Sequence, residues 1–154
     1  MKVPAIIVAC LLGVSAMTDV AAQAMPAAAS QSAPSLYKRL GGYDALAAVT
    51  DDFLQRLVGD PQFARFFGGH STDSLKKIRQ NIVDQLCAAT GGPCVYIGRD
   101  MKTTHAGLGI TEKDWEVTVR HLVATLDKFN VPAKERDEVL GAVSSLKKDI
   151  VEKP

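Results

Sequence analysis

The sequence predicts an all-α domain, and three observations carry this prediction. After about residue 35, apolar residues recur with the three- and four-residue spacing of amphipathic helices. Glycine and proline clusters interrupt this pattern and mark the expected helix ends. No two alternating segments flank a tight turn, so the sequence predicts no β-hairpin.

Local signals place each helix in turn. Ser35 can cap a short first helix, which Gly41-Gly42 ends. Gly91-Gly92-Pro93 is a strong stop for the long third helix, and Thr111 with Asp114 resembles a capping box. A short turn is expected at 63–67. The expected helices span residues 36–40, 43–58, 73–90, 101–106, 111–129 and 132–150, four of them substantial and two short.

The composition describes a folded domain. The chain has 154 residues, of which 47% are hydrophobic and 23% are charged, and its formal net charge is +1. This composition is too apolar for a disordered chain. The balanced charge argues against a nucleic-acid binder, which needs a strongly basic face.

Residues 1–24 are expected to be a signal peptide. Lys2 precedes an uncharged, largely apolar run from Val3 to Met17, and Ala22-Gln23-Ala24 matches an A-x-A cleavage site. Cleavage after Ala24 predicts a periplasmic or secreted protein without stable membrane association. The alternatives are an uncleaved anchor and a lipoprotein, because Ile7-Val8-Ala9-Cys10 resembles a lipobox.

The expected mature chain has two parts. Residues 25–34 are rich in alanine, serine and proline and predict a flexible spacer, and residues 35–152 form the helical domain. Cys87 and Cys94 flank the glycine turn, and an oxidising compartment permits a disulfide between them. We expect two free thiols instead, because Cys87 lies on a helix whose geometry is not suited to the bond.

One irregular segment is a candidate functional site. About twenty residues, from Gly91 to Ile110, contain little expected helix, and long irregular segments inside compact domains are usually functional. His105 lies there between two glycine-rich stretches, with Met101 one helical turn earlier. A single axial imidazole is enough to bind haem iron. A structural role for a lone histidine is the alternative that these residues alone leave open.

Four motifs, in order and spacing, resemble the group I truncated haemoglobins. The resemblance covers Leu36 to about Ile150. The matching segments are Leu36-Tyr37-Lys38-Arg39-Leu40-Gly41-Gly42, Asp52-Phe53 with Phe66-Phe67, Gly91-Gly92-Pro93 with Tyr96-Ile97-Gly98, and residues 101–110, MKTTHAGLGI.

The resemblance implies a two-over-two helical sandwich around b-type haem, with His105 as the proximal iron ligand. Lys102 or Arg99 is expected to pair with a haem propionate, with a solvated charge as the alternative. The residues expected to line the haem pocket are Phe53, Leu54, Phe67, Ile78, Ile82, Leu86, Met101, Trp115 and Leu122.

The distal side departs from the family pattern. Many members carry a tyrosine after the second-helix phenylalanine, where this chain has Leu54. A glutamine or histidine often faces the iron from the long helix. Counting back from the glycine turn places Ile78 and Ile82 there, and counting forward from Phe66-Phe67 places Arg79 there. The polar candidates nearby are Gln80, Asn81 and Gln85.

The implied function is reversible binding of a diatomic gas, namely dioxygen, nitric oxide or carbon monoxide. The alternative is a haem enzyme, a nitric-oxide dioxygenase or weak peroxidase, which would need an external reductase as partner. A haem-free interaction domain is a third hypothesis, which the motifs disfavour. We expect a monomer or weak dimer and no nucleic-acid partner.

Overall fold

The computed structural model describes residues 33–153, so the expected signal peptide and most of the spacer lie outside the described residues. None of the described helices has the length and apolarity that a membrane span requires. The elements are α1 (Leu36–Arg39), α2 (Gly42–Gly59), η1 (Pro61–Phe63), α3 (Ala64–Phe67), α4 (Thr72–Ala89), α5 (Met101–His105), α6 (Glu112–Lys128), α7 (Ala133–Ser144) and α8 (Lys147–Ile150).

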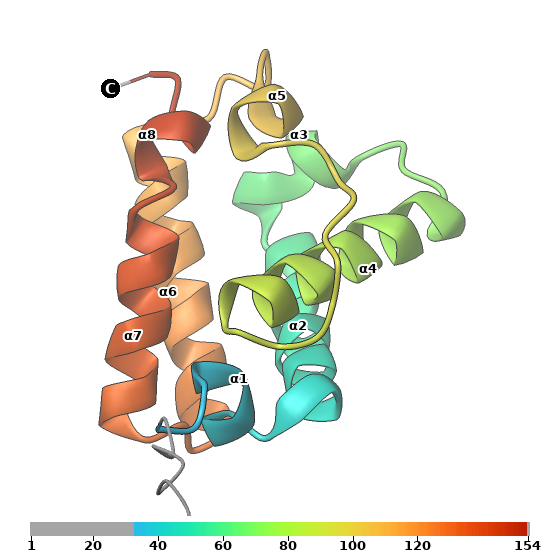
Figure 1. Cartoon of the computed structure of the whole chain (residues 1–154). Coiled ribbons are helices and arrows are strands. Elements are labelled where there is room, and N and C mark those ends of the chain that lie inside the picture. Colours follow the sequence, from blue (N-terminus) through green and yellow to red (C-terminus); the bar gives the residue numbers. More distant parts are fainter. Residues whose placement is uncertain (1–32, 154) are drawn as a thin grey trace, which may run out of the picture. The chain divides into compact units, whose positions relative to one another are not determined.

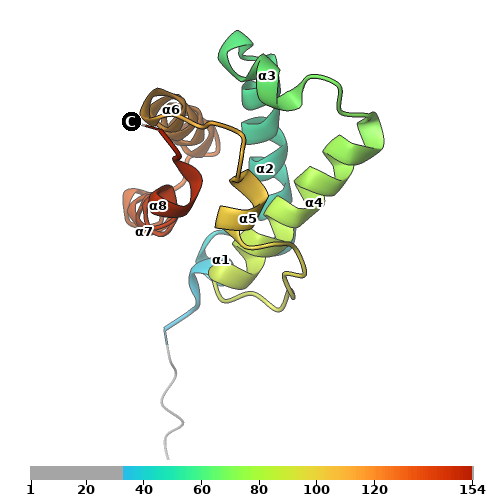
Figure 2. The same ribbon diagram turned by 90° about the horizontal axis from the view of Figure 1, so that it is seen from above.

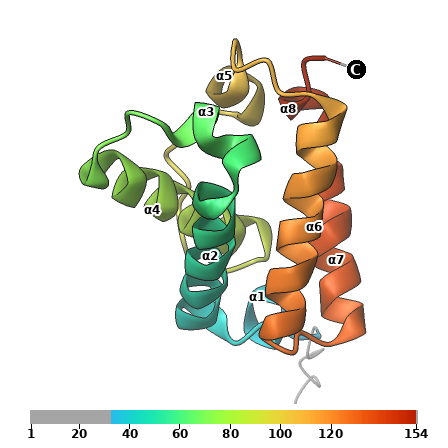
Figure 3. The ribbon, with the colours of Figure 1, turned by 180° about the vertical axis from the view of Figure 1, so that it is seen from behind.

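The long helices form two pairs. Helix α2 packs against α4 and α6, and α6 packs against α7, as Figures 1 and 3 show from opposite sides. The short α5 contacts α8 and, seen from above, lies between the two pairs (Figure 2). The expected two-over-two arrangement of helices is therefore confirmed.

Two apolar clusters form the core. Leu57, Phe63 and Val117 make the first, and Leu122, Leu126 and Val139 make the second. Phe53 packs against both clusters, so it joins the core of the α2 side to that of the α6–α7 side. Burial of these side chains supplies the main stabilisation of the helix pairs.

The helix signals are largely confirmed, with one correction at the end of the chain. Thr111 and Asp114 form the expected capping box at the start of α6, and Ser35 accepts a bond from the Lys38 amide. The expected last helix, however, is divided into α7 and α8. The Ser145 hydroxyl donates to the Ala142 carbonyl at 2.6 Å, and such local bonds compete with continuous helix.

The expectation of two free thiols is wrong. Cys87 and Cys94 form a disulfide, with their Cα atoms 5.7 Å apart. The chain can reverse so tightly because Gly91 adopts a left-handed φ of +80°. A Cβ at Gly92 would lie 2.6 Å from Tyr37 Cδ2 and 2.7 Å from Cys87 Sγ, so only glycine fits there.

A buried carboxylate joins α2 to α6. Asp52 is 8% exposed and accepts bonds from Lys128, from Arg56 Nε at 2.7 Å and from Thr125 Oγ1 at 2.9 Å. The bond from Lys128 lowers the pKa of Asp52, and the bonds from Arg56 and Thr125 lower it further. Burial acts in the opposite direction, and the resulting pKa is about 2. Asp52 is therefore a charged residue that is stabilised inside the helix interface.

Candidate functional site

His105 is the last residue of α5, and local bonds fix its ring. Asp100 caps the helix by accepting from the Thr103 amide at 2.9 Å. His105 Nδ1 lies 2.8 Å from the Met101 carbonyl oxygen. Because a carbonyl only accepts, Nδ1 carries a proton, and in the neutral tautomer that this bond selects the lone pair is on Nε2. A backbone carbonyl that fixes the tautomer in this way is typical of metal-binding histidines.

A C-terminal residue binds the turn that follows His105. Glu152 Oε1 accepts from the Gly107 amide at 2.6 Å, and Oε2 accepts from the Gly109 amide at 2.5 Å. These two amides lower the pKa of Glu152. The contact lies where α8 approaches α5 near the C-terminal end of the chain (Figure 1). Sequence reasoning missed Glu152, because the two glycines lie more than forty positions away, at separations of 45 and 43.

Apolar side chains from four helices are left half-buried. Leu54 lies on α2, Phe67 on α3 and Met101 on α5. On α4 the buried face consists of Val83 and Cys87, whereas a separate apolar stripe remains half-buried; it comprises Ile78, Ile82 and Leu86. A flat, apolar haem requires an imidazole nitrogen as iron ligand and apolar side chains that are not already buried in the protein core, and the chain offers residues of both kinds. The residues present therefore fit haem.

Other predicted pocket residues lie in the packed core. Trp115 and Leu122 are both 7% exposed on α6, and Leu122 belongs to the second cluster with residues of α7. Phe53 is half-buried between the two clusters. Lys102 and Arg99 are exposed, as a side chain that pairs with a propionate at the protein surface would be.

The polar candidates on α4 separate by helix face. Gln80 is exposed and donates to the Tyr43 hydroxyl at 2.8 Å and to Asp84 at 2.9 Å. It lies two positions from both Ile78 and Ile82, and at about 100° per residue this places it on the opposite side of the helix.

Two other amides lie on the same face as the isoleucines. Asn81 and Gln85 are half-buried, and each follows an isoleucine by three positions. Asn81 and Gln85 therefore remain the polar candidates for the distal side, whereas Gln80 lies on the other side of the helix.

An ion pair accounts for Arg79. Its Nε and Nη2 atoms bind the Asp51 carboxylate at 2.6 and 2.9 Å. Leu54 follows Asp51 by three positions, so Leu54 lies on the α4 side of α2.

The two remaining histidines have other surroundings. His121 Nε2 lies 2.8 Å from Asp60 Oδ2, and its ring centroid is 6.0 Å from that of Phe63. The backbone amide of Gln62 and then His121 lower the pKa of Asp60. His70 is exposed in the loop after α3. Of the three histidines, His105 is the one whose Nδ1 lies within bonding distance of a backbone carbonyl oxygen.

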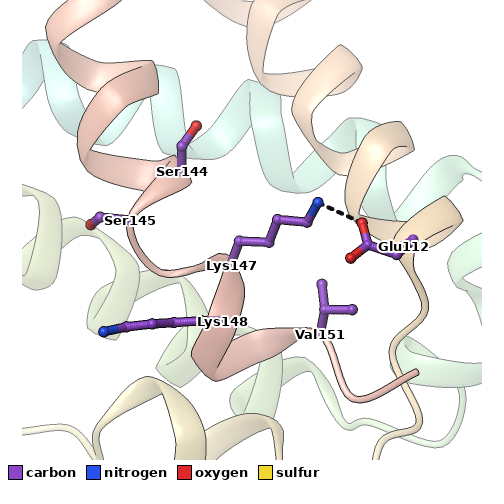
Figure 4. A pocket seen from close by; sticks show the side chains of 6 residues that line it. All are labelled: Glu112, Ser144, Ser145, Lys147, Lys148 and Val151. Atoms are coloured by element: carbon purple, nitrogen blue, oxygen red, sulfur yellow. Dashed lines mark ion pairs between the residues drawn. The ribbon is translucent and has the colours of Figure 1, made fainter. Parts of the chain in front are cut away.

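His105 is not among the residues that line a surface hollow of about 420 Å³ (Figure 4). Lys147 Nζ and Glu112 Oε2 form an ion pair 2.5 Å long across it. Five of its six lining residues are polar or charged, whereas an apolar macrocycle needs apolar walls. We do not assign the hollow to the cofactor; its lining residues are Glu112, Ser144, Ser145, Lys147, Lys148 and Val151.

Comparisons with known proteins match the whole helical domain. The sequence pattern of the family described as bacterial-like globin matches residues 35–152. A group 1 truncated haemoglobin of Mycolicibacterium paratuberculosis is 37% identical over 116 residues, which are 75% of this chain and 83% of the relative. One from Nostoc commune is 32% identical over 119 residues, 77% of this chain and 98% of the relative.

Solved structures show the same architecture. The Fe(III) form of truncated haemoglobin from Tetrahymena pyriformis superposes with a TM-score of 0.70 at 26% identity, over 78% of this chain and 100% of that one. The 2/2 haemoglobin of Synechococcus sp., in a cyanomet state with covalently attached haem, gives 0.69 at 29% identity, over 77% and 98%.

Proposed function

Because the chain belongs to the group 1 truncated haemoglobins of the bacterial-like globin family, which bind haem and gases, we propose that it binds b-type haem through His105 and holds a diatomic gas reversibly. The observation that carries this proposal is the bond between His105 Nδ1 and the Met101 carbonyl. It leaves Nε2 as the ring atom that donates to iron. When bound, the haem supplies the iron position at which a gas attaches.

The residues of the chain orient the cofactor and exclude water. Asp100 caps α5 and so fixes the helix that carries His105. The half-buried stripe Ile78, Ile82 and Leu86 supplies an apolar wall, which favours a flat apolar ligand over water. Lys102, or Arg99, supplies the exposed positive charge for a propionate.

The distal side determines how tightly the gas is held. Leu54 replaces the tyrosine of many relatives, and Ile78 and Ile82 lie on the helix face where a polar partner is common. A strong hydrogen bond to dioxygen is worth about 1.5–3 kcal/mol. We therefore propose a moderate affinity for dioxygen, unless Asn81 or Gln85 donates to it.

Replacement of His105 tests the proposal. We expect His105→Gly to lose the Soret band that wild-type protein shows after haem addition and desalting, while its far-ultraviolet helix signal stays close to wild type. Free imidazole should restore the band, because it replaces the missing ligand in the cavity. His70→Gly is the matched control, since His70 is exposed. Haem retention in the His105 variant, or its loss in the control alone, would refute the assignment.

A second measurement distinguishes the enzymatic hypothesis from reversible gas binding. Rapid mixing of the dioxygen form with nitric oxide gives stoichiometric nitrate if the protein acts as a nitric-oxide dioxygenase. Repeated turnover would then depend on an added external reductase. Reversible binding without conversion supports the gas-binding role.

A further inference from the structure

We propose that Glu152 is a positioning residue for His105. The inference rests on the proposed function, because it concerns how the chain holds its haem ligand. Both carboxylate oxygens of Glu152 accept backbone N–H bonds from the turn that begins directly after His105, at 2.6 Å from Gly107 and 2.5 Å from Gly109. A carboxylate that accepts hydrogen bonds from two amides forms charge-assisted bonds, which are stronger than hydrogen bonds between neutral groups.

The turn depends on these bonds for its shape. Gly107 and Gly109 adopt left-handed φ angles of +81° and +64°, which glycine reaches without steric cost but does not prefer strongly. The Leu108 amide donates to the His105 carbonyl at 3.2 Å and closes the turn. Since both glycines are flexible, an external acceptor is needed to select one conformation of the segment.

Glu152 can perform this role because its own backbone is fixed. Its amide donates to the Ile110 carbonyl at 2.9 Å, and the Glu112 amide donates to the Lys153 carbonyl at 3.1 Å. These bonds join the C-terminal segment to the start of α6, while α8 packs against α5. The carboxylate thus links the segment after α8, which is bonded to the start of α6, to the glycine turn after α5.

The consequence falls on the position of the imidazole. His105 ends α5, so its amino-terminal side is fixed by the helix and its carboxyl-terminal side by the turn. A change in the turn would tilt or shift Nε2 relative to the iron. Ligand groups must be held within a fraction of an ångström by their supporting residues, and loss of that support commonly weakens metal binding by 10- to 100-fold.

Three variants grade the effect. Glu152→Ala removes both acceptors. Glu152→Gln keeps one acceptor oxygen and presents an N–H group to the other glycine amide, so it should give a smaller effect in the same direction. Asp149→Asn is the matched control, because it removes a carboxylate from α8 three positions earlier.

Three readouts are needed. Amide hydrogen exchange of the haem-free protein reports the contact itself, and we expect Gly107 and Gly109 to exchange about tenfold faster in Glu152→Ala. Resonance Raman of the ferrous, gas-free protein reports the iron–histidine stretch, which should shift or broaden in the order wild type, Gln, Ala. Haem transfer to an excess of an apo-globin acceptor should be about tenfold faster for Glu152→Ala.

The outcomes are distinct. Faster exchange together with a changed iron–histidine band and faster haem loss, none of them seen in Asp149→Asn, supports the proposal. Faster exchange with an unchanged band and unchanged haem loss overturns it, since Glu152 would then only stabilise the loop. Unchanged exchange also overturns it. Failure of the proposed function would be recognised differently, by haem retention in His105→Gly. In that case faster amide exchange in Glu152→Ala would report only a structural contact.

Discussion

Replacement of Cys94 by serine removes the disulfide that joins the last turn of α4 to the loop before α5. Cys94 is the better site for the change, because it is half-buried. Cys87 is fully buried, and a free thiol behaves there as a small apolar group. The variant therefore isolates the loss of the covalent link.

The expected magnitude follows from the short loop. The two cysteines are seven positions apart, and the chain-entropy relation gives about 2.5 kcal/mol for a loop of this size. For a domain of roughly 120 residues, this corresponds to a melting temperature lower by about 10 °C. Any relaxation of the loop also reaches α5, since residues 95–100 connect Cys94 to Met101.

The assay compares four samples by thermal unfolding monitored at 222 nm. These are wild-type and Cys94→Ser protein, each with and without reductant. We expect reductant to lower the melting temperature of the wild type to that of the variant and to leave the variant unchanged. Mass determination with and without thiol alkylation assigns the redox state of each sample.

Two results would refute the reasoning. If Cys94→Ser melts at the wild-type temperature, the bond does not restrict the unfolded chain as the loop length requires. If reductant lowers the melting temperature of both proteins equally, its effect does not arise at this disulfide. A loss larger than about 5 kcal/mol would show that the glycine turn itself has collapsed.

Three further predictions concern the distal side, the buried carboxylate and the leader. Leu54→Tyr should slow dioxygen release about tenfold in stopped-flow measurements, the value of one added hydrogen bond, and an unchanged rate would show that residue 54 does not reach the gas. Asp52 has a pKa of about 2 in the folded protein against an ordinary 3.8, so the charged carboxylate contributes about 2 kcal/mol to the free energy of unfolding above pH 4. This contribution is lost as the pH falls toward 2. Asp52→Asn should therefore flatten the fall in stability at acid pH measured by denaturant unfolding, and an unaltered fall would contradict the role of this carboxylate. Mass spectrometry of exported protein should find an amino terminus at Met25, whereas an intact Met1 in native material would remove the signal-peptide interpretation.

Local signals predicted most of the helices, whereas the role of His105 as proximal ligand stays a prediction. The Thr111–Asp114 capping box, for example, spans three positions of the chain. Such interactions depend on neighbours in the chain, so a pattern of residues is enough to predict them. The resemblance to truncated haemoglobins adds the role of His105 for the same reason, because its motifs are short and contiguous.

The polar side chains of α4 show where local reasoning ends. Helical spacing alone places Gln80 on the opposite side of α4 from Ile78 and Ile82. Only the packing of α2 against α4 shows that its amide group donates to the Tyr43 hydroxyl, 37 positions away in the chain. Arg79 likewise forms an ion pair with Asp51 of α2, and the spacing of residues within α4 does not predict this contact.

The sequence by itself determined most of the helical segments and the places where glycines reverse the chain, since these depend on interactions within a few residues. Only the tertiary structure decided that Cys87 and Cys94 pair, because the disulfide requires the particular turn geometry at Gly91 and Gly92. It likewise placed Glu152 against the turn after His105, across 45 positions of chain. A contact between residues so distant has no local signature, because it exists only once α5, α6 and α8 have packed together.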